Sequence, residues 1–156
     1  MKIVQATTKD AEKILEIQKQ AYVREAITYN NYEIAPLIET LDEVLEDFQT
    51  KVIFKAVIDW NIVGSVRGFV EDDVCYVERL MVSPSYQGRG FGKSLMKQLE
   101  SYFIEDCIRF DLYTGSKSIT NLRFYESIGY KPYKTEMIRE NIDFVFMEKE
   151  NIKNIE

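Results

Sequence analysis

Two periods of hydrophobic residues run along this chain, one typical of helices and one typical of strands. Apolar residues recur every three or four positions and predict four helices, in residues 11–22, 41–48, 95–103 and 121–127. Alternating or short apolar runs predict seven strands, in residues 3–6, 52–58, 62–70, 74–82, 108–113, 133–139 and 143–147. The order of elements therefore indicates a mixed α/β protein.

The lengths of the connections predict how neighbouring strands pair. Short polar turns join the second, third and fourth strands, so we expect these to be antiparallel neighbours. A helix separates the fourth strand from the fifth, which favours parallel pairing of those two. We expect one domain over residues 1–150, followed by a polar tail, residues 151–156, that frays.

A glycine-rich loop follows the fourth strand and leads directly into a helix. Its residues are Gln87, Gly88, Arg89, Gly90, Phe91 and Gly92. Alternate glycines let a backbone approach a ligand closely, and the start of a helix offers unpaired N–H groups and the positive end of its dipole. The loop is thus a predicted site for a phosphate or pyrophosphate.

The loop differs at one residue from each of two other phosphate-binding motifs. A nucleoside-triphosphate loop ends like Gly92-Lys93-Ser94, but its first glycine would fall at Gln87. A dinucleotide fingerprint accepts Gly88 and Gly90, but its last glycine would fall at Lys93. Nucleotide binding therefore stays an alternative for this loop.

The amino-acid composition limits which partners and which catalytic groups the chain can have. The chain has 156 residues and a formal charge of −6, which disfavours nucleic acid as a partner and suits a cationic substrate, although acidic surfaces mostly serve solubility. It has no apolar run long enough for a membrane span and no signal peptide, so we expect no membrane contact and a cytoplasmic location. With no histidine, and two cysteines in no metal spacing, we expect neither a histidine triad nor a metal site.

The loop and a second motif together resemble the GNAT superfamily of acyl-CoA-dependent N-acetyltransferases. The family's loop pattern, Gln/Arg-x-x-Gly-x-Gly/Ala, is matched in full by residues 87–92. The second signature is Asn121-Leu122-Arg123-Phe124-Tyr125-Glu126, closed by Gly129-Tyr130. The resemblance implies a GNAT fold, whose mostly antiparallel, twisted sheet of about seven strands splays between the fourth and fifth strands. It also implies acetyl-CoA as co-substrate and allows a homodimer.

The resemblance further implies which residues bind the cofactor. The amides of residues 87–92 and the start of the next helix, at Lys93, would bind the pyrophosphate of coenzyme A. The backbone of Leu80, Met81 and Val82 would pair with the pantetheine arm as an added strand does. Asn121 and Tyr125 lie four residues apart on one helix face, which the family aims at the pantetheine and the sulfur.

Acyl transfer to an amine requires a proton for the leaving thiolate and a neutral amine. Tyr125 is the candidate acid, as is common in the family; the alternative is that it only packs against the cofactor. Glu78 shares strand parity with Leu80 and Val82 and is the candidate base, because a carboxylate in an apolar strand is costly unless paired or used. The alternative for Glu78 is a salt bridge with Arg67 or Arg79.

The amine acceptor is expected near the loop between the first two helices and the last two strands. Tyr22, Tyr29, Tyr32 and Glu33 are candidates, because aromatic rings and a carboxylate suit an ammonium group; ordinary packing explains them equally well. We therefore expect transfer of an acetyl group to a primary amine of a small molecule or peptide. The alternative is a non-catalytic acyl-CoA sensor.

Overall fold

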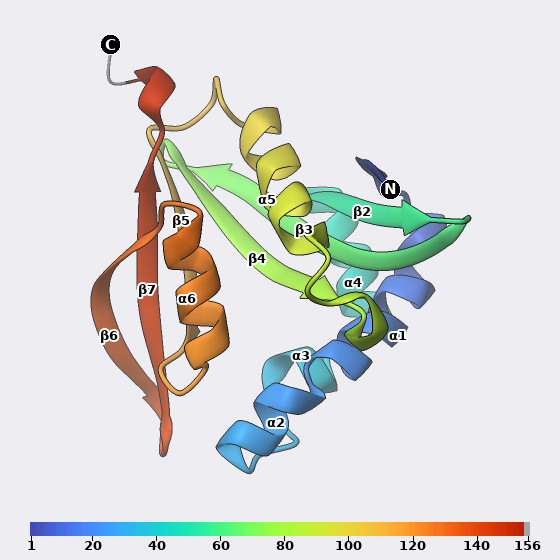
Figure 1. Cartoon of the computed structure of the whole chain (residues 1–156), viewed down its shortest axis with the longest axis horizontal. Helices are drawn as coiled ribbons and strands as arrows, with labels where there is room; N and C mark the ends of the chain where they lie inside the picture. The colour runs from blue at the N-terminus through green and yellow to red at the C-terminus, as the bar shows by residue number, and fades with distance from the viewer. Residues whose placement is uncertain (155–156) are drawn as a thin grey trace.

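A computed structural model describes residues 1–154 of the chain (Figure 1). The first half contains β1 (Lys2–Gln5), a 3-10 turn (Thr8–Asp10), α1 (Ala11–Ala21), α2 (Val23–Tyr29), α3 (Ala35–Ile38), α4 (Leu41–Thr50), β2 (Val52–Ile58) and β3 (Asn61–Glu71). The second half contains β4 (Val74–Val82), a 3-10 turn (Pro84–Tyr86), α5 (Phe91–Tyr102), β5 (Arg109–Gly115), α6 (Ile119–Ser127), β6 (Lys131–Arg139), β7 (Ile142–Glu150) and a last turn (Ile152–Asn154).

The seven strands form one sheet in the order β1-β2-β3-β4-β5-β7-β6. Every neighbouring pair is antiparallel except β4 and β5, which are parallel, as the helix between them predicts. Only three residue pairs join β4 to β5, from Val74–Arg109 to Tyr76–Asp111. Beyond them the two strands separate, and Figure 1 shows the sheet parting into two halves there. The seven strands and the splayed parallel junction confirm the expected architecture.

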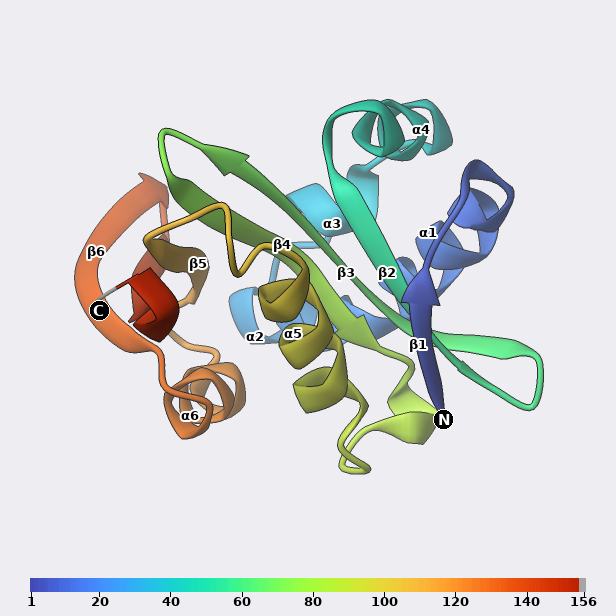
Figure 2. The ribbon, with the colours of Figure 1, turned by 90° about the horizontal axis from the view of Figure 1, so that it is seen from above.

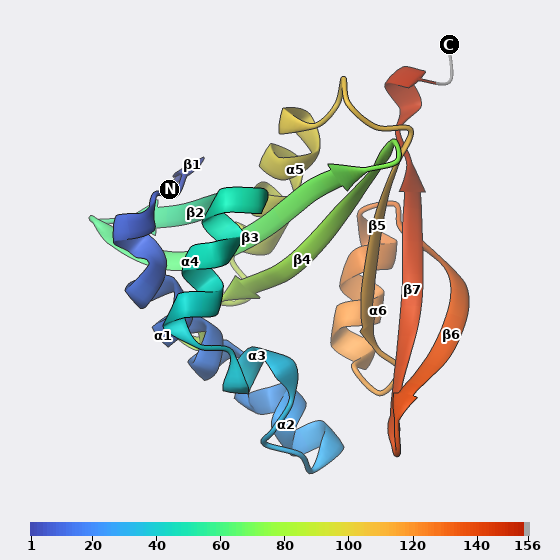
Figure 3. The same ribbon diagram turned by 180° about the vertical axis from the view of Figure 1, so that it is seen from behind.

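Helices cover the two faces of the sheet unequally. Viewed from above, α5 and α6 lie on one side of the sheet and α1 and α4 on the other (Figure 2). From behind, α1 and α4 cover the β2–β4 half, with α2 and α3 below them, while the β5–β7–β6 half has no helix in front of it (Figure 3). Leu95, Met96 and Leu99 of α5 fill the core of the first face, and Ile14 and Ile17 of α1 fill the smaller core of the second.

All four predicted helices are present, and two short helices, α2 and α3, were not predicted. The seven-residue α2 buries only Ala26, so it carries almost no apolar stripe for a sequence pattern to detect. The four-residue α3 begins around Pro36, a residue that favours the first turn of a helix. By contrast, α4 has the expected capping box, in which Thr40 and Glu43 bond to each other's backbone N–H. No helix within residues 1–154 is both long and apolar enough to cross a membrane.

The chain stays anchored beyond residue 150. Asn151 is buried, and its side-chain amide donates to the carbonyl oxygens of Ile104 and Cys107 at 2.7 and 2.8 Å. The fraying expected from residue 151 therefore does not begin there, because these bonds fasten the end of β7 to the segment before β5. The last two residues of the predicted tail, 155–156, lie outside the described residues.

Candidate active site

A cavity of about 640 Å³ occupies the gap where β4 and β5 separate. Its walls come from β4, the glycine loop, the start of α5, β5 and α6, and its floor includes α2 and the β6–β7 hairpin. Since β4 has no partner strand on this side after Tyr76, its backbone groups face the cavity. An extended ligand with amide groups can bond to such an edge as an added strand does.

The glycine loop has the geometry that an anion site requires. Gly88 and Gly90 have φ angles of +77° and +86°, a region that side-chain-bearing residues seldom adopt, and a Cβ at either position would meet no atom within 4 Å. The backbone is therefore open to a ligand on this side. Gln87 braces the loop by donating to the carbonyl oxygen of Val82 at 3.0 Å. The loop leads into the twelve-residue α5, whose first N–H groups have no partner within the helix.

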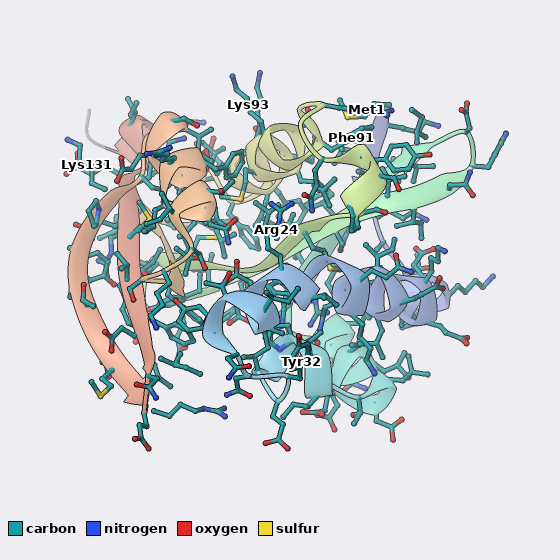
Figure 4. The ribbon with its side chains drawn as sticks, turned by 60° about the horizontal axis from the view of Figure 1, so that its bottom comes forward. Met1, Arg24, Tyr32, Phe91, Lys93 and Lys131 are labelled. Atoms are coloured by element: carbon teal, nitrogen blue, oxygen red, sulfur yellow. The ribbon has the colours of Figure 1, made fainter. Side chains whose placement is uncertain are left out.

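The predicted cofactor residues divide by position. Those that line the cavity are Leu80, Met81, Val82, Gln87, Gly88, Gly90, Phe91, Gly92, Lys93, Asn121 and Tyr125. Arg89 does not line it, and its guanidinium lies over the ring of Tyr86, 5.2 Å from the centroid. The side chain of Phe91 is mostly core, with 4% exposure. Lys93 projects outward from the first turn of α5 (Figure 4).

A β-bulge interrupts β4 beside the cavity. On β3, Val66 alone lies opposite two residues of β4, Arg79 and Leu80, because the register shifts between the flanking pairs. Arg79 adopts the strained backbone conformation of this bulge, with a φ of +52° in the left-handed region. The bulge turns the strand and reverses which side chains face which side of the sheet beyond it.

The prediction that Glu78 shares a face with Leu80 and Val82 is therefore wrong. Leu80 and Val82 pack toward the core beneath α5, whereas Glu78 lies opposite Arg67 on the face covered by α1 and α4. Its carboxylate accepts a bond of 2.8 Å from the ammonium of Lys51, so its partner is neither of the two predicted arginines. Burial works against the charge of Lys51, but its bonds to Glu78 and Asp47 outweigh this and raise its pKa. Glu78 still lines the cavity.

Arg67 is the centre of a buried ionic cluster beneath the bulge. Its side chain has no exposure, and its guanidinium donates to Glu39 at 3.0 Å, Asp47 at 2.8 Å and Gln18 at 2.6 Å. These bonds join β3 to α1, α4 and the segment between α3 and α4. Burial would raise the pKa of Glu39, but its hydrogen bond with Gln18 and the charge of Arg67 outweigh this and lower it. The cluster holds the helices of this face against the bulged strand.

Two α6 side chains face the cavity, as the four-residue spacing predicts. Tyr125 is partly buried, and its hydroxyl makes no hydrogen bond to any of residues 1–154. Burial, the largest effect, raises its pKa well above the ordinary value of 10.0, so the hydroxyl keeps its proton near neutral pH. The Asn121 amide donates to Glu25 at 3.2 Å and to Thr114 at 3.4 Å. Within residues 1–154 the hydroxyl of Tyr125 is thus unpaired, while Asn121 is held in place by two hydrogen bonds.

The α1–α2 segment closes the cavity from below by bonding to β4 and to the region of β5 and α6. Tyr22 donates its hydroxyl to the carbonyl oxygen of Leu80 at 3.1 Å, and burial, the largest effect, raises its pKa to about 12. Glu25 accepts from Ser118 as well as from Asn121. No sequence pattern points to Glu25, because its position in the site depends on a contact with a residue 93 positions away.

The four predicted acceptor residues separate into two pairs. Tyr22 and Tyr29 line the cavity. The hydroxyl of Tyr29 accepts from the backbone N–H of Lys117 at 2.9 Å, and only a glycine at position 115 leaves room for it. Tyr32 and Glu33 are exposed and do not line the cavity, and Tyr32 lies on the far side of the N-terminal helices (Figure 4). Among residues 1–154, no group of three or more Asp, Glu or Cys side chains is arranged to hold a metal ion.

Solved structures with this fold include N-acetyltransferases. PaiA N-acetyltransferase from Thermoplasma acidophilum, in complex with coenzyme A, has a TM-score of 0.80 and 18% identity, covering 96% of this chain and 98% of that one. The ribosomal-protein-S18-alanine N-acetyltransferase from Escherichia coli has a TM-score of 0.78 and 15% identity, covering 96% and 92%. At this identity the likeness establishes the fold.

Sequence relatives extend the comparison. The chain is 31% identical over 117 residues to an N-acetylaspartate synthetase from Xenopus tropicalis, covering 70% of this chain and 42% of the relative. It is 30% identical over 83 residues to an uncharacterized N-acetyltransferase from Methanocaldococcus jannaschii, covering 52% and 53%. The chain thus spans about half the length of these curated relatives. The family model for the acetyltransferase (GNAT) domain matches residues 17–151, from α1 to the end of β7, and the chain belongs to the GNAT acetyltransferase family.

Proposed function

We propose that this protein is an N-acetyltransferase that moves the acetyl group of acetyl-CoA directly to a primary amine. The observation that carries the proposal is the cavity between the parted strands β4 and β5, with the glycine loop at one end and the unpaired hydroxyl of Tyr125 inside it. Acetyl-CoA would supply an activated thioester, whose C–S bond breaks as the C–N bond of the amide forms.

The residues of the cavity divide the tasks of binding and orientation. The N–H groups of the loop around Gly88 and Gly90 and the start of α5 would bind the pyrophosphate. The open edge of β4 from Leu80 to Val82 would bond to the amides of the pantetheine arm and present an N–H to the acetyl oxygen as it gains charge. The contact from Tyr22 to Leu80 fixes this strand edge from the side of the acceptor.

Tyr125 would give its proton to the leaving thiolate. A general acid must be protonated at the working pH, and a tyrosine hydroxyl meets this condition near neutral pH. No protein group competes for the proton, because the hydroxyl has no hydrogen-bond partner in the described chain. A sensor without catalysis would not require this donor, and no observation favours that alternative.

Glu78 has two proposed roles that one experiment separates. The ion pair with Lys51 gives it a structural role. Its position on the wall of the cavity would also let it take the proton of the amine through water. If it is the base, Glu78→Gln should move the rising, acid-side limb of the activity profile upward in pH, because the reaction then depends on the small neutral fraction of the amine. Lys51→Met, which breaks the same ion pair but keeps the carboxylate, should retain most of the activity. An identical profile in Glu78→Gln would leave only the structural role.

The experiment that tests the proposed function is release of the coenzyme A thiol from acetyl-CoA across a panel of amines. The panel should contain amino acids, polyamines, aminoglycosides and short peptides, and mass spectrometry should identify the acetylated product. Thiol release that depends on an amine would support the proposal. Tight binding of acetyl-CoA without transfer to any amine, including candidate protein acceptors, would contradict it.

A further inference from the structure

Arg79 is a charged residue in an unusual place. It occupies the strained position of the β4 bulge, with a φ of +52°, and its side chain is only 17% exposed. It lines the cavity between the parted strands. A charged side chain at a strained and largely buried position carries two costs, so it calls for a compensating contact.

The protein itself supplies this contact only in part, through an ion pair with Glu39 and without a hydrogen bond. Among residues 1–154 the guanidinium of Arg79 makes no hydrogen bond, and its buried Nε has no partner. Its closest carboxylate oxygen is Oε2 of Glu39, 3.6 Å away, which is longer than a hydrogen bond. Arg67, in the same region, donates three bonds of 2.6–3.0 Å instead. Arg79 therefore keeps donors for a ligand.

The carboxylates near Arg79 make their hydrogen bonds with other residues. Glu39 binds Arg67 and Gln18 through its other oxygen, and Glu78 binds Lys51. Glu25, on the floor of the cavity, binds two residues of the β5–α6 region. Burial works against the charge of Arg79, but the nearby Tyr22, Glu39 and Glu78 outweigh this and raise its pKa. Its N–H groups nonetheless make no hydrogen bond within residues 1–154, so they stay available to a negative group.

Two further arginines add positive charge at the floor of the cavity. Arg24 and Arg139 line the cavity and are exposed, and Figure 4 shows Arg24 beside the middle of the sheet. Arg79 lies away from the loop of residues 87–92. That loop follows the end of β4 and leads to α5, on the other face of the sheet from α1 and α4 (Figure 2). Phosphates at the loop would leave Arg79 available.

We propose that Arg79 binds a carboxylate of the acceptor, so that the substrates are amines that also carry a carboxylate, as free amino acids do. A guanidinium presents two parallel N–H groups that match a carboxylate. Such a bond would fix the acceptor on the side of the cavity opposite α5, with its amine free to reach the acetyl group. This proposal rests on the proposed function and narrows its acceptor.

The test compares amino acids with their own amides, which differ only in the carboxylate. Acidic, apolar and basic amino acids should each be titrated as such a pair into the protein saturated with coenzyme A, and acetylation rates should be measured for the same pairs. Charge-assisted bonds of this kind correspond to a preference of about 10- to 100-fold for the free acid. Arg79→Gln should abolish this preference, and Arg79→Lys should retain part of it.

The control is Arg123→Gln, which removes an exposed positive charge on α6 outside the cavity and should change nothing. Thermal unfolding of each variant should confirm that it is folded. Equal binding of acids and amides, no binding of either, or an equal loss for both in Arg79→Gln would overturn the proposal. A loss of acetyl-CoA affinity in Arg79→Gln would overturn it too, by assigning the anion to the cofactor. Carboxylate-selective binding without any acetylation would support the role of Arg79 and contradict the proposed function.

Discussion

Two neighbouring tyrosines should separate catalysis from stability. Tyr125 and Tyr130 both border the core beneath α6, with ring centroids 6.0 Å apart. Changing either to phenylalanine removes one oxygen atom. The hydroxyl of Tyr125 faces the cavity without a partner, whereas that of Tyr130 donates to Glu100 at 2.8 Å, and its side chain is 1% exposed.

The expected magnitudes follow from these contacts. Tyr125→Phe breaks no hydrogen bond, so the free energy of unfolding should change by no more than about 0.5 kcal/mol. Tyr130→Phe removes a bond to a charged group, typically about 1.5–3 kcal/mol. The lower end applies because Glu100 keeps its ion pair with Lys149 at 2.8 Å. For a domain of this size, that loss lowers Tm by roughly 3–6 °C.

The loss of kcat should be large in Tyr125→Phe and small in Tyr130→Phe, the reverse of the loss of stability. A positioned general acid contributes about 10²- to 10⁴-fold to a rate, so kcat of Tyr125→Phe should fall at least about 100-fold while its affinity for acetyl-CoA stays near that of the unmodified protein. Tyr130→Phe should keep its kcat, because its hydroxyl points at Glu100.

Thermal unfolding, calorimetric binding of acetyl-CoA and thiol release would measure all three quantities on the same samples. A kcat of Tyr125→Phe within a few fold of the unmodified protein would refute its role as the acid. An equal fall in both variants would show that the loss comes from packing.

Three further predictions concern the glycines and the ionic cluster. Gly115→Ala places a Cβ against the hydroxyl of Tyr29, so Tyr29 must move. We expect about 1–3 kcal/mol of lost stability and a raised KM for the amine, and unchanged kinetics would contradict a role for Tyr29. In Gly90→Ala the new Cβ meets no neighbouring atom, but alanine is strained at a φ of +86°, so the free energy of unfolding should fall by about 1 kcal/mol. The Kd for acetyl-CoA should rise, and an unaltered Kd would argue against the loop as the phosphate site. The folded-state pKa of Glu39 lies below its ordinary 4.5, so its stabilising effect is present above that pH and is lost as the pH falls through the folded pKa. Urea unfolding at a series of acidic pH values should show this fall in the free energy of unfolding. Glu39→Gln should make the free energy of unfolding depend less steeply on pH in that range.

The pattern of the sequence predicted most of the fold, because the features concerned are local. Seven strands, four helices and the parallel junction between β4 and β5 follow from hydrophobic spacing and connection length. The short helices α2 and α3 escaped detection because they bury almost nothing along a regular stripe. The anchoring of Asn151 escaped it because its partners lie more than 40 residues earlier.

For the site, the sequence by itself determined the glycine loop and the α6 face with Asn121 and Tyr125. Backbone freedom at glycine and the four-residue helix period are properties of a short stretch of chain. Only the tertiary structure decided the faces of β4. The bulge at Arg79 inserts one residue into the strand, and this single insertion moved Glu78 to the opposite side of the sheet from Leu80. A bulge depends on the pairing of β4 with β3, so alternation within one strand cannot reveal it, and the ion pair of Arg79 with Glu39 joins residues 40 positions apart.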